Sequence, residues 1–240
     1  RELHISNLLD QVERLKAENE ALRWDALRQQ YCEEGYCVVD GTVDDVMRDK
    51  LIGTTDRITE KTRSGVWKHR RGVNGPFPPY RDDGDDVWGA NLIMDPELGE
   101  HATLLEWMGS PGIAGSCAKL LQCEVHELQL ELTGLLFGPK LADYALPWHR
   151  DTISNELCGP EELAELQKRS INGVQWNTAL FDDSGFVFVP GSHLRSKTPE
   201  ELQIIQSDPF KPLPGQRTLQ LKAGQTCFYN QDLLHRGVYD

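Results

Sequence analysis

The sequence has 240 residues and a formal net charge of −13 at pH 7, from 38 Asp and Glu against 25 Lys and Arg. A chain of this length can bury one core of its own, which predicts a single domain with a small appendage. The acidic balance argues against a nucleic-acid-binding surface, which is normally basic, and no apolar run is long enough to cross a bilayer.

The six cysteines are scattered, with no C-x-x-C pair and no dense framework. This pattern is typical of reduced thiols and not of a disulfide scaffold. No signal-peptide pattern opens the sequence. Together these features predict a cytoplasmic protein.

Residues 1–28 differ from the rest of the chain and predict an amphipathic, coiled-coil-like helix. A repeat with alternating steps of three and four residues is the a/d pattern of a coiled coil. Here the repeat runs through Ile5, Leu8, Val12, Leu15, Asn19, Leu22 and Ala26. A β-branched residue and one Asn at a, with Leu at d, favour a parallel two-stranded register.

Charges beside this repeat agree with the parallel register, since Glu18 at g would attract Arg23 at e of a partner helix. One interpretation is a homodimer through residues 3–27. The other is a single amphipathic helix that lies on the catalytic domain.

The next part of the chain predicts a strand and then helices around an irregular loop. Turn residues and hydrophobic periodicity predict strands over 35–41 and 125–136, and helices over 43–59, 96–108 and 112–121. The loop 68–81 is rich in positive charge. It could be a lid that attracts an anionic substrate, or a solvated loop paired with Asp82, Asp83, Asp85 and Asp86.

The segment 147–152 carries the first candidate chemistry. In an extended segment, residues i and i+2 point to the same side, so His149 and Asp151 can bind one ion while Arg150 faces away. With the distant His235, they offer two imidazoles and a carboxylate. Such a set can occupy three neighbouring positions on an octahedral metal and leave the opposite face free, as in non-haem Fe(II) oxygenases. Alone, an H-x-D tripeptide also fits an exposed turn.

Four strands are predicted in the second half of the chain, over 173–181, 186–194, 217–221 and 226–230, the last leading to His235. Along the first of them, Asn177 and Ala179 share one face. Between the second and third, Thr198 and Glu201 predict the capped start of a helix.

In this order the segments resemble the phytanoyl-CoA dioxygenase-like family of Fe(II)/2-oxoglutarate-dependent oxygenases. The motifs that carry the resemblance are W-H-R-D (148–151), G-V-Q-W-N-T-A-L (173–180), V-P-G-S-H (189–193), L-K-A-G-Q-T (221–226) and L-L-H-R-G-V-Y (233–239). G-Y-C-V-V-D-G (35–41) is similar to the family's first strand. The resemblance defines a catalytic domain over residues 29–240.

This resemblance implies a mainly β fold, a double-stranded β-helix or cupin-like jelly-roll barrel with helices outside it. It implies that His149, Asp151 and His235 are the catalytic iron ligands, with 2-oxoglutarate and O2 as co-substrates. Asn177 would contact the co-substrate, or else be an ordinary strand residue near the barrel mouth. Because Asp151 is not a small residue, the expected reaction is hydroxylation of a C–H bond in a small organic substrate and not halogenation.

The sequence departs from the family in one respect. The family has an arginine about ten residues beyond the distal histidine, where its planar fork binds 2-oxoglutarate. This chain stops at Asp240, so we expect a fragment truncated before that arginine. Arg236 would point away from the ligand side of its strand and is a poor substitute.

Two other functions use the same donor set. One is a metal-binding cupin-type barrel without oxygenase activity, acting as a sensor or scaffold, and the other is a zinc hydrolase. His193 lies in a family motif but outside the expected triad, and we expect it to make local hydrogen bonds.

Overall fold

The computed structural model describes residues 2–71, 87–138, 140, 143–169 and 173–239. The predicted loop 68–81 falls mostly outside the described residues, as do Asp82, Asp83, Asp85 and Asp86. Among the described helices, none combines the length and apolar character that a membrane span requires.

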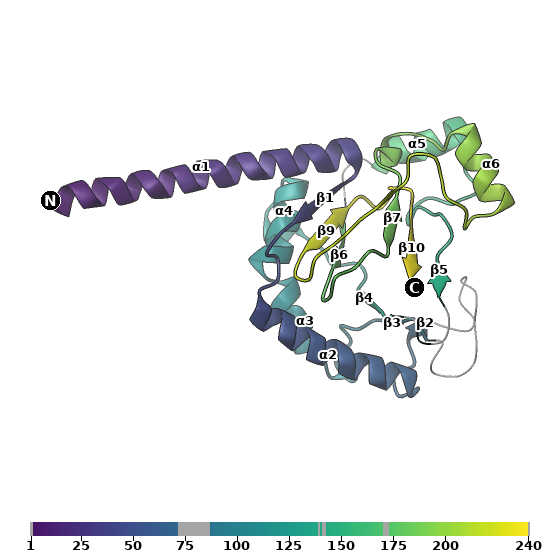
Figure 1. Ribbon diagram of the computed structural model, residues 1–240, viewed down its shortest axis with the longest axis horizontal. Helices are drawn as coiled ribbons and strands as arrows, with labels where there is room; N and C mark the ends of the chain where they lie inside the picture. Colours follow the sequence, from purple (N-terminus) through teal and green to yellow (C-terminus); the bar gives the residue numbers. More distant parts are fainter. Residues whose placement is uncertain (1, 72–86, 139, 141–142, 170–172, 240) are drawn as a thin grey trace.

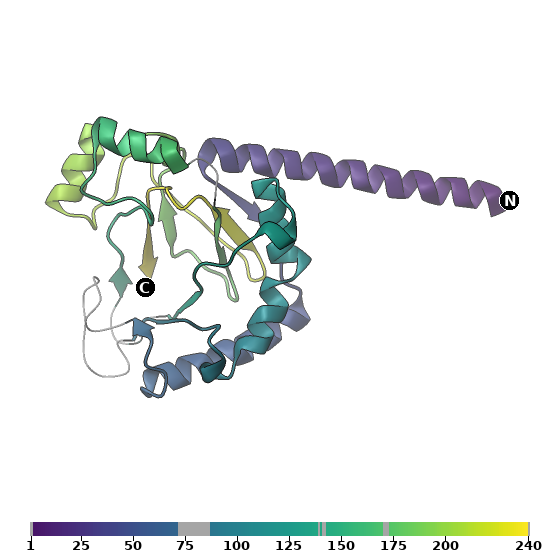
Figure 2. The same ribbon diagram turned by 180° about the vertical axis from the view of Figure 1, so that it is seen from behind.

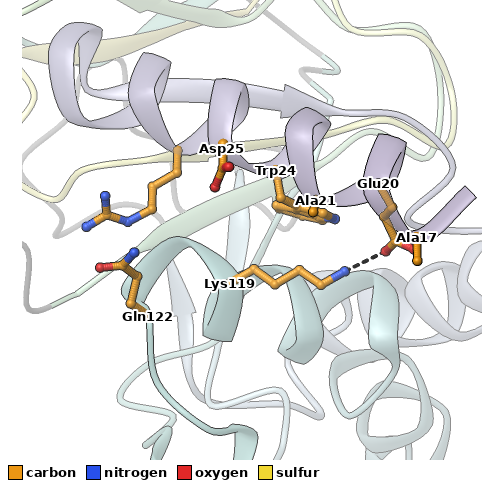
Figure 3. A pocket seen from close by; sticks show the side chains of 8 residues that line it. Ala17, Glu20, Ala21, Trp24, Asp25, Lys119 and Gln122 are labelled. Atoms are coloured by element: carbon orange, nitrogen blue, oxygen red, sulfur yellow. Dashed lines mark hydrogen bonds and ion pairs between the residues drawn. The ribbon is translucent and has the colours of Figure 1, made fainter. Parts of the chain in front are cut away.

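The N-terminal helix α1 (Glu2–Glu34) is longer than the sequence predicted and extends as a rod away from the rest of the molecule (Figure 1). Its last turns pack on α4 (Ser116–Leu121), where Lys119 forms an ion pair of 2.8 Å with Glu20. The Lys119 ammonium also lies 4.6 Å from the ring centre of Trp24 (Figure 3). The first half of α1 therefore stands free of the domain.

In the part of the chain that the structure describes, the strands form three antiparallel sheets. The first has the order β1 (Tyr36–Val39), β9 (Thr226–Tyr229), β6 (Gln175–Thr178). The second has the order β5 (Tyr144–Ala145), β10 (His235–Tyr239), β7 (Phe186–Phe188), β8 (Arg217–Thr218). The third joins β2 (Arg70–Arg71), β3 (Gly89–Asn91) and β4 (Gly134–Leu136). Within the described ranges the sheets do not join into a closed barrel.

The first two sheets face each other through aromatic side chains. Tyr36 of β1 and Phe188 of β7 have ring centres 4.4 Å apart, and Phe186 and Tyr229 have centres 4.7 Å apart. Because side chains alternate along a strand, Val187 points to the other face, where it packs with Trp148 and Leu234. The sheet that contains β10, and so His235, therefore has the aromatic cluster of Phe186 and Phe188 on one face and the cluster of Trp148 and Leu234 on the other.

Helices cover the outer faces (Figures 1 and 2). Tyr31 of α1 and Leu120 of α4 pack on Phe228 of β9. The other helices are α2 (Asp45–Arg63), α3 (His101–Met108), α5 (Gly159–Arg169) and α6 (Pro199–Ser207), with short helical turns η2 (Pro96–Leu98), η3 (Pro111–Gly115), η4 (Val125–Glu127) and η5 (Ser192–Leu194). Thr198 and Glu201 form the predicted capping box of α6.

Several predicted boundaries were wrong for local reasons. The predicted strand 125–136 is a strand only at β4, because Glu124 and Glu127 form a capping box that turns the chain into η4. The predicted helix 96–108 is broken at Gly99, whose φ of 80° lies in the left-handed region. The predicted strand 186–194 ends at Phe188, and residues 192–194 form η5.

The junction of α1 and β1 needs a glycine. Gly35 has a φ of 85°, and a Cβ atom there would lie 2.6 Å from both His193 Nδ1 and Leu233 Cδ1. We therefore expect Gly35→Ala to lower the free energy of unfolding by more than the roughly 1–2 kcal/mol of a left-handed non-glycine residue, measured by urea denaturation. Gly215→Ala has a similar φ of 72° with nothing within 4 Å, so it reports the backbone cost alone. An equal loss in both variants would contradict the close packing at Gly35.

Candidate metal centre

His149 and His235 come together through paired backbone. They form an isolated antiparallel bridge, in which the His149 amide donates to the His235 carbonyl at 3.1 Å and the His235 amide donates to the His149 carbonyl at 3.0 Å. The two imidazole centres lie 4.4 Å apart. The bridge thus joins the 147–152 segment to the first residue of β10.

Asp151 completes the group. Its Oδ1 atom lies 3.5 Å from His149 Nε2, and its Oδ2 atom lies 3.4 Å from His235 Nε2. One possible ligand atom from each residue can be chosen so that all lie within 4.8 Å of one another. Donors at right angles and about 2.1 Å from a shared metal would be about 3 Å apart, so only small side-chain shifts are needed. The structure therefore brings together the three residues that the sequence singled out.

Hydrogen bonds at the far side of each ring fix which nitrogen faces the cluster. His149 Nδ1 lies 2.7 Å from the Pro147 carbonyl, and His235 Nδ1 lies 2.8 Å from the Leu233 carbonyl. A carbonyl only accepts, so each Nδ1 carries the proton and each Nε2 offers a lone pair. Both histidines are presented as neutral Nε2 ligands.

The electrostatics of the site favour this protonation state. Burial lowers the pKa of His235 to about 4, and the nearby His149 adds to this effect. Burial alone would raise the pKa of Asp151, but the adjacent His149 and His235 rings lower it to about 2. At neutral pH His235 is thus a neutral imidazole and Asp151 an ionised carboxylate, the forms that bind metal.

The mixed nitrogen and oxygen donor set fits a divalent transition metal such as iron. Its third ligand also remains partly accessible, because the Asp151 side chain is 32% exposed while that of His235 is 7% exposed. The arrangement is closed by protein on the His235 side and open beside Asp151. An ion held here can therefore be reached by a small molecule.

Gln175 is a site residue that the sequence interpretation missed. It lies near Asp151 and makes the smallest contribution to the low pKa of that carboxyl group, after His149 and His235, which together outweigh burial. The signal was present in the alternation of β6, since Gln175 shares a face with Asn177, whereas Trp176 packs on the opposite, helix-covered face. Asn177 therefore lies on the strand face that Gln175 presents to the metal ligands.

Aromatic rings surround His235. The ring centres of Phe186 and Tyr229 lie 5.5 and 5.3 Å from the centre of its imidazole. These apolar surfaces account for the burial that lowers the His235 pKa. They leave the ring edge that carries Nε2 directed to Asp151.

Two nearby basic residues point elsewhere, as expected. Arg236 places its guanidinium 4.9 Å from the Trp148 ring centre and donates to the Phe210 carbonyl, so it is directed away from the ligand side of β10. His193 is buried and its Nε2 lies 3.1 Å from the Cys32 carbonyl, which is a local structural contact outside the triad. All six cysteines are free thiols.

Comparison with known proteins gives one family and several similar folds. The family model described as phytanoyl-CoA dioxygenase (PhyH) matches residues 31–238. No curated protein sequence matches the chain.

The similar solved structures share the fold at low sequence identity. AviO1 from Streptomyces viridochromogenes Tue57 is 16% identical, with a TM-score of 0.62 over 90% of this chain and 87% of that chain. EctD from S. alaskensis, solved with 2-oxoglutarate and 5-hydroxyectoine, is 14% identical, with a TM-score of 0.61 over 89% and 69%. The non-haem α-ketoglutarate-dependent epimerase SnoN from nogalamycin biosynthesis is 18% identical, with a TM-score of 0.58 over 91% and 75%.

The buried state of His235 predicts a pH-dependent stability of the metal-free protein. Its pKa is about 4 in the folded protein against an ordinary value of 6.5, so the unfolded chain binds more protons between these pH values. We expect the free energy of unfolding to fall as pH decreases from about 6.5 to about 4. Asp151 contributes below this window, because its pKa changes from 3.8 to about 2.

Urea unfolding at pH 7 and pH 5 measures this effect. His235→Gln should show a smaller loss of stability between the two pH values than the unchanged protein. His126→Gln is the control, since His126 is exposed in η4. Equal pH dependence in all three proteins would exclude His235 as the titrating group.

Proposed function

Because the chain belongs to the phytanoyl-CoA dioxygenase family, we propose that His149, Asp151 and His235 hold its iron and that the enzyme hydroxylates a C–H bond of a small organic substrate. The chain is an Fe(II)- and 2-oxoglutarate-dependent dioxygenase by family membership. The family membership also argues against the two other functions that the donor set allowed, a metal-binding scaffold and a zinc hydrolase.

One observation carries the assignment of the ligands. Two Nε2 atoms and one carboxylate converge, while each Nδ1 proton is engaged by a carbonyl two residues earlier in the chain. The backbone bridge orders both histidines together. Such a set supplies a facial triad and leaves the remaining positions on the metal for other molecules.

Bound iron would supply the activation of O2 and the oxidation of the substrate C–H bond. The protein's residues hold the metal ligands in place, bind 2-oxoglutarate and exclude water. Gln175 lies near the Asp151 carboxylate and helps to keep it ionised, and Phe186 and Tyr229 keep water from the His235 side of the centre. Asn177, on the same face of β6 as Gln175, is our proposed contact for 2-oxoglutarate.

The type of reaction and of substrate follows from two further points. A carboxylate at position 151 fills the ligand position that a halogenating relative would leave free, so hydroxylation is favoured. The EctD structure contains 5-hydroxyectoine together with 2-oxoglutarate, which supports a small organic substrate for this chain as well.

We also propose that residues 1–28 are a separate element from the catalytic domain, residues 29–240, and that residues 3–27 form a parallel homodimer. From Val12 onward the a/d stripe is exposed: Val12 is 46% exposed, Leu15 is 54% exposed and Leu22 is 66% exposed. This exposure supports pairing with a second helix over packing of the stripe on the domain.

The contacts of α1 with its own domain use the opposite side of the helix. Trp24 and Tyr31 occupy f positions and Leu27 occupies a b position of the same heptad register, and these three pack toward α4 and β9. In a two-stranded coiled coil, b, c and f positions point away from the partner helix. A second copy can therefore pair with the stripe while each catalytic domain stays on the outer side of the coil.

The iron site is tested by anaerobic titration of the protein with Fe(II) and then 2-oxoglutarate. We expect a saturable, weak visible charge-transfer band. His149→Ala should lack the band and lose more iron affinity than the about 10–100-fold typical of removing an outer partner of a ligand. His126→Ala, which removes an exposed histidine of η4, should behave as the unchanged protein.

The outcomes separate the parts of this proposal. Iron binding without the band would support the ligand triad and contradict chelation of 2-oxoglutarate by this chain. Unchanged iron affinity in His149→Ala would contradict the triad itself.

The dimer is tested by sedimentation equilibrium of the unchanged protein and of the double variant Leu15→Glu, Leu22→Glu. We expect the unchanged protein to have twice the monomer mass and the variant to be monomeric, because four carboxylates would face one another across the seam. Ala17→Glu adds one carboxylate per chain at an f position and should remain dimeric. A monomer in all cases, or equal dissociation by Ala17→Glu, would contradict pairing through the stripe.

A further inference from the structure

A buried ionic cluster lies directly behind the metal centre. Arg150, between two of the proposed ligands, has a side chain that is 1% exposed and forms an ion pair of 2.9 Å with Glu162 of α5, which is 0% exposed. The same carboxylate oxygen accepts from Lys197 Nζ at 2.7 Å, and the other accepts from the Lys197 amide at 2.8 Å. Three charged side chains are thus removed from water together.

Stability alone is a weak reason for such a cluster. Desolvating charged groups is costly, and buried ion pairs can often be replaced by apolar residues without loss of stability. What the cluster provides is a fixed position for the Arg150 guanidinium. A planar group with five donors can hold several acceptors in one geometry, which a lysine ammonium cannot reproduce.

The remaining donors of Arg150 bind the backbone of segments that surround the site. Nη1 donates to the Ser192 carbonyl at 2.9 Å and also to the Asp232 carbonyl, and Nη2 donates to the Arg195 carbonyl at 3.1 Å. Asp232 belongs to the turn that leads into β10 and therefore to His235. One side chain thus connects the 149–151 ligand segment to the segment that carries the third ligand.

Two further contacts join the same two segments. The Asp151 amide donates to the Gln231 carbonyl at 3.0 Å, and the Thr152 hydroxyl donates to the Asp232 carboxylate. The Asp232 amide is in turn bound by the Asn230 side chain at 2.9 Å. The turn 230–234 is therefore held against the 149–152 segment from several directions, and the buried Arg150 makes one of these contacts, to the Asp232 carbonyl.

We propose that Arg150 is a positioning residue for the metal centre: held by Glu162, its guanidinium fixes the His149 and Asp151 segment against the turn that precedes His235. This inference rests on the proposed metal site. The side chain does not touch the ion. It acts by keeping the three donors in place before the ion binds, so that binding does not have to order them.

The test compares metal affinity with stability in matched variants. Arg150→Lys keeps a positive charge beside Glu162 but loses the fork that reaches Ser192 and Asp232. Glu162→Gln keeps the shape and removes the charge that holds Arg150. Glu100→Gln is the matched control, because Glu100 also receives an arginine and a lysine, Arg57 at 2.9 Å and Lys61 at 2.9 Å, and its side chain is 10% exposed.

Binding is measured by titration of each metal-free protein with Co(II), followed by its visible absorption, at a temperature at which urea curves show that the protein is folded. We expect Arg150→Lys and Glu162→Gln to bind Co(II) about 10–100-fold more weakly than the unchanged protein. Glu100→Gln should keep the unchanged affinity, even where its unfolding midpoint falls as much as that of the other variants.

Each other outcome overturns the idea. Unchanged affinity in Arg150→Lys and Glu162→Gln, with binding by the unchanged protein, would contradict the positioning role but leave the metal site intact. An equal loss in Glu100→Gln, or failure of both cluster variants to fold, would assign the cluster to structure alone. No binding by the unchanged protein would overturn the proposed site and the positioning role together.

Discussion

Two backbone hydrogen bonds pair His149 with His235, and the remaining features of the centre depend on this pairing. An antiparallel bridge sets two side chains next to each other on one side of the sheet. Each ring is then turned by its own Nδ1 contact, so that two lone pairs meet the Asp151 carboxylate. The packing of β1, β9 and β6 against β10 and β7 holds the bridge in place, because close-packed interiors have low compressibility.

The features that could be predicted from sequence are those set by residues close together in the chain. The spacing of His149 and Asp151 follows from strand alternation, and the direction of Arg150, away from the donor atoms, follows from the same rule. The capping box at Thr198 and Glu201 is likewise local. His235 could be joined to them only by the ordered set of motifs, since no local rule connects residues so distant in the chain.

The parts that could not be predicted depend on contacts between distant segments. Gln175 was overlooked in favour of its neighbour Asn177, because the sequence shows a shared strand face but not which member of that face reaches Asp151. The partners of Arg150 come from three separate segments, and no pattern in residues 147–152 predicts them. For residues 125–136 the apolar pattern favoured a strand, but the capping box of Glu124 and Glu127 starts the short helix η4 instead.

The charges around the centre give a physical reason for burying a cation behind two ligands. Burial is the main cause of the lowered pKa of His235, and Arg150 adds to it, so that imidazole stays neutral and free to bind a metal. An uncompensated guanidinium would also repel the incoming ion. Glu162 and Asp232 supply two negative charges near Arg150 and Lys197, so the cluster is close to neutral as a whole. A divalent ion bound by Asp151 and two neutral imidazoles then keeps one net positive charge, which attracts an anionic co-substrate such as 2-oxoglutarate to the open side of the site.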